Sequence, residues 1–206
     1  MTAAARVFLL SPAHCGGERA RLLFREGADF DLARRVRRPP GAPLGEVFAF
    51  LSGLYFRRKL AYAQAFACPP AGVAGVYVIT PNEGLRPADD LVDLARLRGF
   101  AQVDIDADDA RYHHPLRRDA RRLAAALTLA GEVVLLGSVA TGKYVDPLAE
   151  ALGDRLWFPS DFVGRGDMSR GGLLLRCVRD GRELDYVAVA GAERRGSRPA
   201  RLERRR

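Results

Sequence analysis

Cysteine is scarce in this chain, and its positions exclude two common ways of stabilising a small protein. Cys15, Cys68 and Cys177 lie far apart, are odd in number and form no Cys-x-x-Cys pair. Neither a disulfide framework nor a zinc ribbon fits this spacing. We therefore interpret the three thiols as small apolar side chains in a protein from a reducing compartment.

Long apolar runs are missing as well. No stretch of about eighteen uncharged apolar residues occurs, so the sequence predicts no transmembrane helix. The apolar stretch at 7–10 is too short for a secretory signal, and only Arg6 supplies positive charge before it. These absences predict a cytoplasmic protein with no membrane partner.

The size and composition predict one folded domain followed by a basic tail. The chain has 206 residues, of which 48% are hydrophobic, and this suffices for a single core over 1–190. The formal charge is +8, and the stretch 193–206 contributes much of it with seven Arg and two Glu. We therefore predict that 191–206 is a disordered basic tail, which either attracts polyanions or only keeps the protein in solution.

Apolar runs alternate with helical patterns along the chain. Short apolar runs predict strands at 6–10, 75–79, 101–105, 132–136, 155–158 and 183–189. Periodic apolar positions and capping residues predict helices at 18–25, 46–67, 87–98, 115–129, 146–152 and 167–179. The alternation predicts an α/β three-layer sandwich, with a mostly parallel central sheet and helices on both faces.

Polar side chains follow the predicted strands, where parallel sheets bind their ligands. We expect His14 to act as an acid, base or hydrogen-bond donor, and Glu83 or Asp167 to act as a base or charge stabiliser. We expect Lys143, Arg165 and Arg170 to hold phosphate. The full set of candidate ligand-binding residues is Ser11, Thr80, Asn82, Gly137, Ser138, Thr141, Lys143, Tyr144, Arg165 and Arg170.

The stretch 137–144, Gly-Ser-Val-Ala-Thr-Gly-Lys-Tyr, matches a phosphate-binding P-loop except at its last residue. Tyr144 stands where a small hydroxyl should hold magnesium. The pair Asp146-Pro147 also predicts a helix start three residues after Lys143, whereas a P-loop lysine lies in the first turn of its helix. We therefore predict a looser phosphate or sugar contact by Ser138, Thr141 or Lys143.

No metal or cofactor site is predicted. Asp104, Asp106 and Asp108 have the spacing of a calcium loop, but Asp109 replaces the required glycine and Pro115 the required glutamate. We interpret this stretch as a solvated acidic turn.

Several short strings resemble known families. The stretch 132–140 resembles the strand and Leu-Gly-x-x-Ala turn of the uracil-DNA glycosylase-like superfamily, and 158–160 reads Phe-Pro-Ser where that superfamily carries His-Pro-Ser. The strings at 10–13 and 52–55 are similar to strings of the peroxide-stress YaaA family, and 78–87 resembles related uncharacterised bacterial domains. The resemblance implies a bacterial three-layer α/β sandwich with a nucleobase, nucleotide or nucleic-acid ligand. It implies no reaction.

The leading hypothesis is a nucleotide- or nucleic-acid-associated protein of unknown reaction, and the sequence leaves open whether it is an enzyme that acts at an N-glycosidic or phosphate-bearing group. A second hypothesis is a non-catalytic DNA- or RNA-binding module, which uses its tail, the cations 57–59 and the basic helix face 117–122. A third is a scaffold without a small-molecule site. The sequence leaves open which holds, and it also leaves the oligomeric state open.

Overall fold

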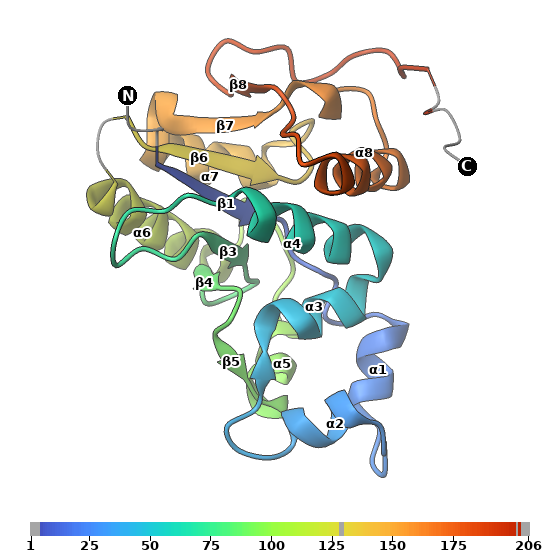
Figure 1. Cartoon of the computed structure of the whole chain (residues 1–206). Coiled ribbons are helices and arrows are strands. Elements are labelled where there is room, and N and C mark those ends of the chain that lie inside the picture. The colour runs from blue at the N-terminus through green and yellow to red at the C-terminus, as the bar shows by residue number, and fades with distance from the viewer. Residues whose placement is uncertain (1–4, 128–129, 201, 203–206) are drawn as a thin grey trace.

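The computed structural model describes residues 5–127, 130–200 and 202. Its centre is a six-stranded sheet in the order β4-β3-β1-β6-β7-β8 (Figure 1). Four inner strands run parallel, namely β1 (Arg6–Leu10), β3 (Val76–Ile79), β6 (Glu132–Leu136) and β7 (Leu156–Pro159). The edge strands β4 (Leu85–Pro87) and β8 (Tyr186–Ala188) pair antiparallel. The predicted mostly parallel sheet is confirmed.

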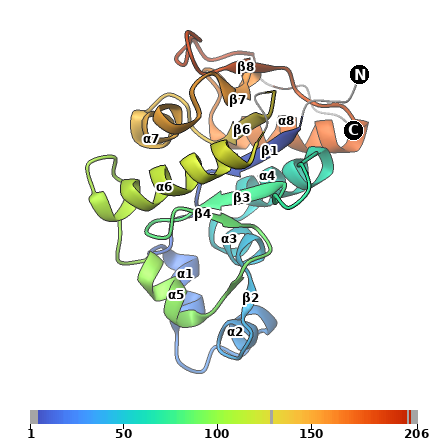
Figure 2. The same ribbon diagram turned by 90° about the vertical axis from the view of Figure 1, so that its left-hand side faces the viewer.

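Helices cover both faces of this sheet (Figures 1 and 2). Helices α4 (Leu54–Phe66) and α8 (Asp167–Asp180) pack on the face that Phe8 and Leu10 enter. Helices α6 (Ala110–Ala126) and α7 (Gly142–Leu152) pack on the face that Val7 and Leu9 enter. Because the inner strands are buried on both faces, they are apolar without alternation. The predicted three-layer sandwich is therefore present.

A smaller group of elements extends below the sheet in Figure 1. It contains α1 (Glu18–Phe24), α2 (Asp31–Val36), α3 (Leu44–Ser52), α5 (Leu94–Phe100) and a two-stranded sheet of β2 (Ala42–Pro43) with β5 (Leu91–Val92). Phe48 of α3 joins this group to the main core through an edge-on contact with Phe56 of α4, and it also packs edge-on against Phe100 of α5 within the group. Gly53, at φ 73°, separates α3 from α4.

Three boundary predictions are wrong. The predicted helix at 87–98 is replaced by the end of β4, by β5 and by α5. The predicted strand at 101–105 forms no strand, because its polar residues lead into the N-terminus of α6. That helix begins at Ala110 rather than Pro115, since the Asp109 side chain caps it by accepting the Arg111 N–H at 2.9 Å. Residues 128–129 lie outside the described residues.

The start of α7 also differs from the prediction. It begins at Gly142, four residues before Asp146, and Pro147 lies inside it. Proline lacks the N–H that would bond to the Lys143 carbonyl one turn earlier. The Tyr112 hydroxyl donates to that carbonyl instead, at 2.9 Å. A hydrogen bond from α6 therefore compensates for the proline.

Part of the predicted basic tail lies against the domain. The Arg195 Nε donates to the Ala140 carbonyl at 3.1 Å, and the Arg165 Nη1 donates to the Ala200 carbonyl at 3.3 Å. The segment from 191 to 200 thus contributes contacts to the folded unit. Within 5–127, 130–200 and 202, no helix has the length and apolar character needed to cross a membrane.

Candidate functional site

The strand order places a topological switch point between β1 and β6. The chain leaving β1 returns to the sheet at β3 on one side, whereas the chain leaving β6 goes to β7 on the other. Doubly wound sheets bind ligands outside the carboxyl ends of the strands at such a point. Ser11 directly follows β1 and Gly137 directly follows β6. A Cβ on Gly137 would lie 2.7 Å from the Ser11 Cβ, so the two strand ends touch.

Lys59 lies beneath this point, on the inner face of α4. Lys59 is 1% exposed. Its Nζ donates to the Oγ and to the carbonyl oxygen of Ser11, at 2.7 Å in both cases. The Nζ also lies 4.8 Å from the ring centre of Tyr55 and 4.9 Å from that of Phe56. A hydroxyl, a carbonyl and two aromatic faces thus surround the amine.

The surroundings of Lys59 favour its neutral form. Within the part of the chain that the structure describes, its Nζ forms no ion pair with a carboxylate. Burial lowers the pKa of Lys59, the negative charge of Asp167 opposes this shift, and the positive charge of Arg170 adds to it, which together give a pKa of about 7. Near neutral pH, a large fraction of this amine therefore carries a free electron pair.

Helix α8 supplies charged groups beside the amine. Arg170 is buried, and its Nε and Nη2 donate to the Phe162 carbonyl at 3.2 and 3.1 Å. Its Nη1 lies 3.6 Å from the Asp167 carboxylate, which is largely exposed in the first turn of the helix. Gly171 permits this arrangement, because a Cβ there would press on the side chains of Arg58 and Tyr55.

Two phenols complete the site. The Tyr55 hydroxyl is buried near Arg170, and it makes no well-formed hydrogen bond with the rest of the described protein. Tyr144 packs into the core from α7 and faces the negative charge of Asp167. Burial raises the pKa of Tyr144 to about 12 and that of Tyr55 further still. Both phenols therefore remain protonated near neutral pH and can donate hydrogen bonds.

The structure thus brings together five of the residues that the sequence predicted. They are Ser11, Gly137, Tyr144, Asp167 and Arg170, and they surround Lys59 and Tyr55 at the switch point.

The candidates that follow β3 have structural partners instead. The Glu83 carboxylate forms ion pairs with Arg86 at 3.0 Å and Arg96 at 2.6 Å. The Thr80 hydroxyl donates to the Gly84 carbonyl at 2.9 Å and closes the turn before β4. The Asn82 Nδ2 donates to the Gly99 carbonyl at 3.0 Å and ties that turn to α5. Within the described ranges, no hydrogen bond or ion pair links these three side chains to Ser11 or Lys59.

Four other candidates follow β1 or β6, namely His14, Ser138, Thr141 and Lys143, and Arg165 lies in the loop before α8. His14 is exposed, and its ring lies over the backbone of Gly16 and Gly17. Thr141 occupies the N-cap position of α7 without a side-chain cap. The Lys143 Nζ lies 5.0 Å from the centre of the Tyr144 ring. Ser138 follows Gly137 and is half-buried.

The structure has one feature that agrees with a P-loop at 137–144 and others that do not. Lys143 does lie in the first turn of its helix, so the predicted helix start at Asp146 was a wrong argument against a P-loop. However, the Asp146 carboxylate lies beside Gly142, where a P-loop would hold phosphate. Tyr144 is buried and cannot be replaced by a magnesium-binding hydroxyl without a cavity.

Lys59 and Tyr55 were not predicted as site residues. The run Arg57-Arg58-Lys59 was interpreted as solvated cations that could meet a nucleic-acid backbone, and burial of Lys59 shows this to be wrong at position 59. A signal was present, because Lys59 lies three residues after Phe56 and four before Ala63, on the buried face of α4.

Part of the positive charge on the basic face of α6 is paired within the chain. Arg117 and Arg121 form ion pairs with Glu150 at 2.8 and 2.7 Å, and Arg118 pairs with Asp119 at 2.8 Å. This face therefore presents less free positive charge than the sequence suggests.

The chain matches no protein-family model, no curated protein and no solved structure. The functional argument therefore rests on the geometry of the site.

Proposed function

We propose that the protein is an enzyme that acts on a nucleotide-type substrate at the switch point, with Ser11 as the nucleophile and Lys59 as its base. The observation that carries this proposal is the 2.7 Å hydrogen bond between the Lys59 Nζ and the Ser11 Oγ. A buried amine with a lowered pKa is one of the recognised activators of a serine hydroxyl. Its position at the carboxyl ends of two central parallel strands is where such sheets hold substrates.

The proposed step needs only groups that are present. The neutral Lys59 amine takes the proton of the Ser11 hydroxyl while Oγ forms a bond to an electrophilic carbon or phosphorus of the substrate. The leaving group departs with its bonding electrons and receives that proton back from the Lys59 ammonium. Water then releases the group held on Ser11. The Arg170 guanidinium and the Tyr55 phenol would stabilise negative charge that develops during both steps.

The substrate class has weaker support than the reactive pair. The short strings shared with nucleobase-handling families favour a nucleotide, and so does the use of switch points by mononucleotide-binding sheets. A cytoplasmic setting also belongs to this proposal, since the three cysteines are free thiols. The non-catalytic alternative is less favoured, because Lys59 is buried and the α6 arginines are paired.

A fluorophosphonate probe tests the reactive pair, because such probes label activated serine hydroxyls. We expect labelling of Ser11 in the wild type, with a rate that rises with pH through about 7 as Lys59 loses its proton. Ser11→Ala and Lys59→Met should abolish labelling. Ser52→Ala removes an exposed serine at the end of α3 and should leave labelling unchanged.

The two parts of the proposal can fail separately. Absence of labelling in the wild type, or equal labelling of Lys59→Met, would refute the reactive pair. If Ser11 is labelled but no member of a nucleoside-phosphate panel is hydrolysed, the pair stands and the substrate class is wrong.

A further inference from the structure

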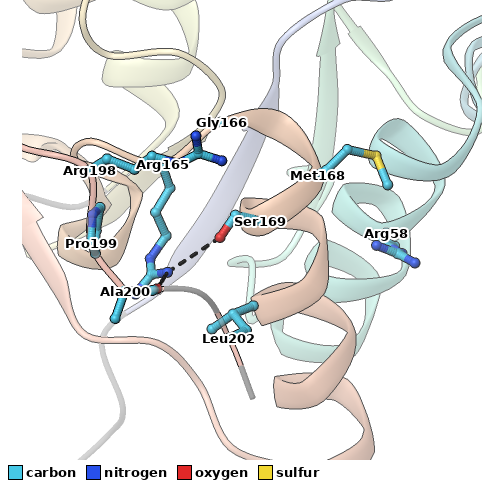
Figure 3. A pocket seen from close by; sticks show the side chains of 9 residues that line it. All are labelled: Arg58, Arg165, Gly166, Met168, Ser169, Arg198, Pro199, Ala200 and Leu202. Carbon is cyan, nitrogen blue, oxygen red and sulfur yellow. Dashed lines mark hydrogen bonds between the residues drawn. The ribbon is translucent and has the colours of Figure 1, made fainter. Parts of the chain in front are cut away.

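A cavity that does not include Ser11 or Lys59 lies at the start of α8. Its volume is about 700 Å³, and its polar lining comes from Arg58, Arg165, Ser169 and Arg198. Figure 3 shows Arg165 reaching from the loop before α8 toward Ser169, with Arg198 and Ala200 of the C-terminal segment beside it. Three parts of the chain that are distant in sequence thus form one cavity.

The cavity has an excess of positive charge. Three arginines line it, and none of its lining residues is a carboxylate. The nearest carboxylate to Arg165 is that of Asp161, at 4.0 Å. The structure shows no ion pair or side-chain hydrogen bond for Arg58 or Arg198 among the residues it describes. These guanidinium groups are therefore available to an anion.

The Arg165 guanidinium has a hydrogen-bond donor without an acceptor. Its Nη1 is shared between the Ser169 hydroxyl and the Ala200 carbonyl, each at 3.3 Å. Its Nε is buried and has no hydrogen-bond partner among the described atoms. A buried N–H of this kind is costly unless a ligand or water accepts its hydrogen bond.

We propose that this cavity binds a small organic phosphate, whose phosphate group accepts hydrogen bonds from Arg165 and Arg198. Guanidinium groups pair with phosphate through two parallel N–H bonds, which makes arginine the preferred side chain for such an anion. Arg58 lines the side of the cavity toward α4 and contributes a third positive charge. Met168, which is 66% exposed, offers an apolar surface to the organic part of the ligand.

The shape favours a small ligand over a nucleic-acid strand. The C-terminal segment, through Arg198, Pro199 and Ala200, forms one wall, so the arginines line a hollow and do not form an open row. The volume lies within the range of roughly 300–1,000 Å³ that is usual for small-molecule sites.

Calorimetric titration tests the proposal with pyrophosphate and adenosine diphosphate as probes, at low salt. We expect both to bind the wild type, and Arg198→Gln to weaken binding about tenfold. Arg165→Lys should also weaken binding, because it keeps the charge but removes the paired N–H donors. Arg57→Gln is the matched control: it removes an exposed arginine next to Arg58, outside the cavity, and should leave affinity nearly unchanged.

Three outcomes would overturn the proposal. The first is no binding of either probe at millimolar concentration. The second is an equal loss of affinity in Arg57→Gln and Arg198→Gln, which would indicate only general charge attraction. The third is binding of a single-stranded oligonucleotide through Arg165 and Arg198 more tightly than either probe. Lys59 does not line this cavity, so weaker probe binding in Arg198→Gln and lost fluorophosphonate labelling in Lys59→Met are separate results, and this proposal and the proposed reaction fail independently.

Discussion

Replacing Lys59 with methionine should change how the stability of the protein depends on pH. In the wild type, burial lowers the pKa of Lys59 to about 7, whereas a lysine in an unfolded chain titrates near 10.5. Between these values the unfolded state binds more protons than the folded state, so the free energy of unfolding rises with pH. Below pH 7 both states are protonated, and Lys59 contributes no further pH dependence.

The expected size follows from the shift. Each pH unit inside the window corresponds to about 1.4 kcal/mol for one proton. From pH 7 to 9.5, the wild type should therefore gain roughly 3 kcal/mol relative to Lys59→Met. Below pH 7, Lys59→Met should approach or exceed the wild type in stability. The variant no longer buries a charge, although it loses two hydrogen bonds to Ser11.

Urea unfolding between pH 6 and 9.5 measures this difference, with fluorescence of the single tryptophan, Trp157, as the signal. Other groups also titrate: burial raises the pKa of Cys15 to about 12, as it does for Tyr144, and these groups lower stability at high pH. They are present in both proteins, so their effect cancels in the difference. Arg57→Met removes an exposed arginine from the same helix and serves as the control.

If the wild-type and Lys59→Met curves stay parallel from pH 7 to 9.5, Lys59 titrates as an ordinary lysine. The reasoning from its burial would then be refuted, and so would its role as a base near neutral pH.

Three further predictions concern packing and charge. Gly137→Ala places a Cβ 2.7 Å from that of Ser11, so fluorophosphonate labelling should fall sharply and urea unfolding should show a loss of about 1–2 kcal/mol. Arg6→Gln leaves Glu132 and Glu183 facing each other without the guanidinium that joins them, and should cost roughly 2 kcal/mol by the same assay; an unchanged midpoint would contradict this. Gly53→Ala combines a positive φ with a collision against the Arg19 guanidinium, so it should lower the melting temperature more than Gly72→Ala, which has a similar φ but open space around it.

The sheet was predictable because its inner strands have uninterrupted apolar sequences. The run Val133-Val-Leu-Leu136 is apolar at every position, and only a strand covered on both faces requires that. The same reasoning located Ser11 and Gly137 at strand ends. Their contact follows from strand order, which places β6 beside β1 and which no local pattern encodes.

The helix starts were less predictable, because tertiary contacts decided them. Asp146-Pro147 has the sequence of a helix start, yet α7 begins at Gly142, since the Tyr112 hydroxyl satisfies the carbonyl that Pro147 leaves free. The start of α6 was missed for a local reason: the Asp109 side chain caps the helix by accepting the Arg111 N–H, so Pro115 lies inside the helix and does not begin it.

Only some of the residues of the site were predicted from the sequence. Arg170 and Asp167 were predicted as site residues, but Lys59 was not, because it lies in a run of three consecutive cations. Composition marks such a run as solvated, and only its place on the apolar face of α4 distinguishes Lys59 from Arg57. Composition does not show which charged side chain of a helix is buried. The helical spacing from neighbouring apolar residues does, provided that charged residues are included when the pattern is examined.

Every step proposed for Ser11 requires Lys59 to be a largely neutral, buried amine at physiological pH. The chain has only two lysines, Lys59 and Lys143, so lysine-selective ¹³Cε NMR gives two resonances, and Lys59→Met identifies one of them. We expect the Lys59 resonance to titrate with a midpoint near pH 7. A midpoint near 10 would contradict it.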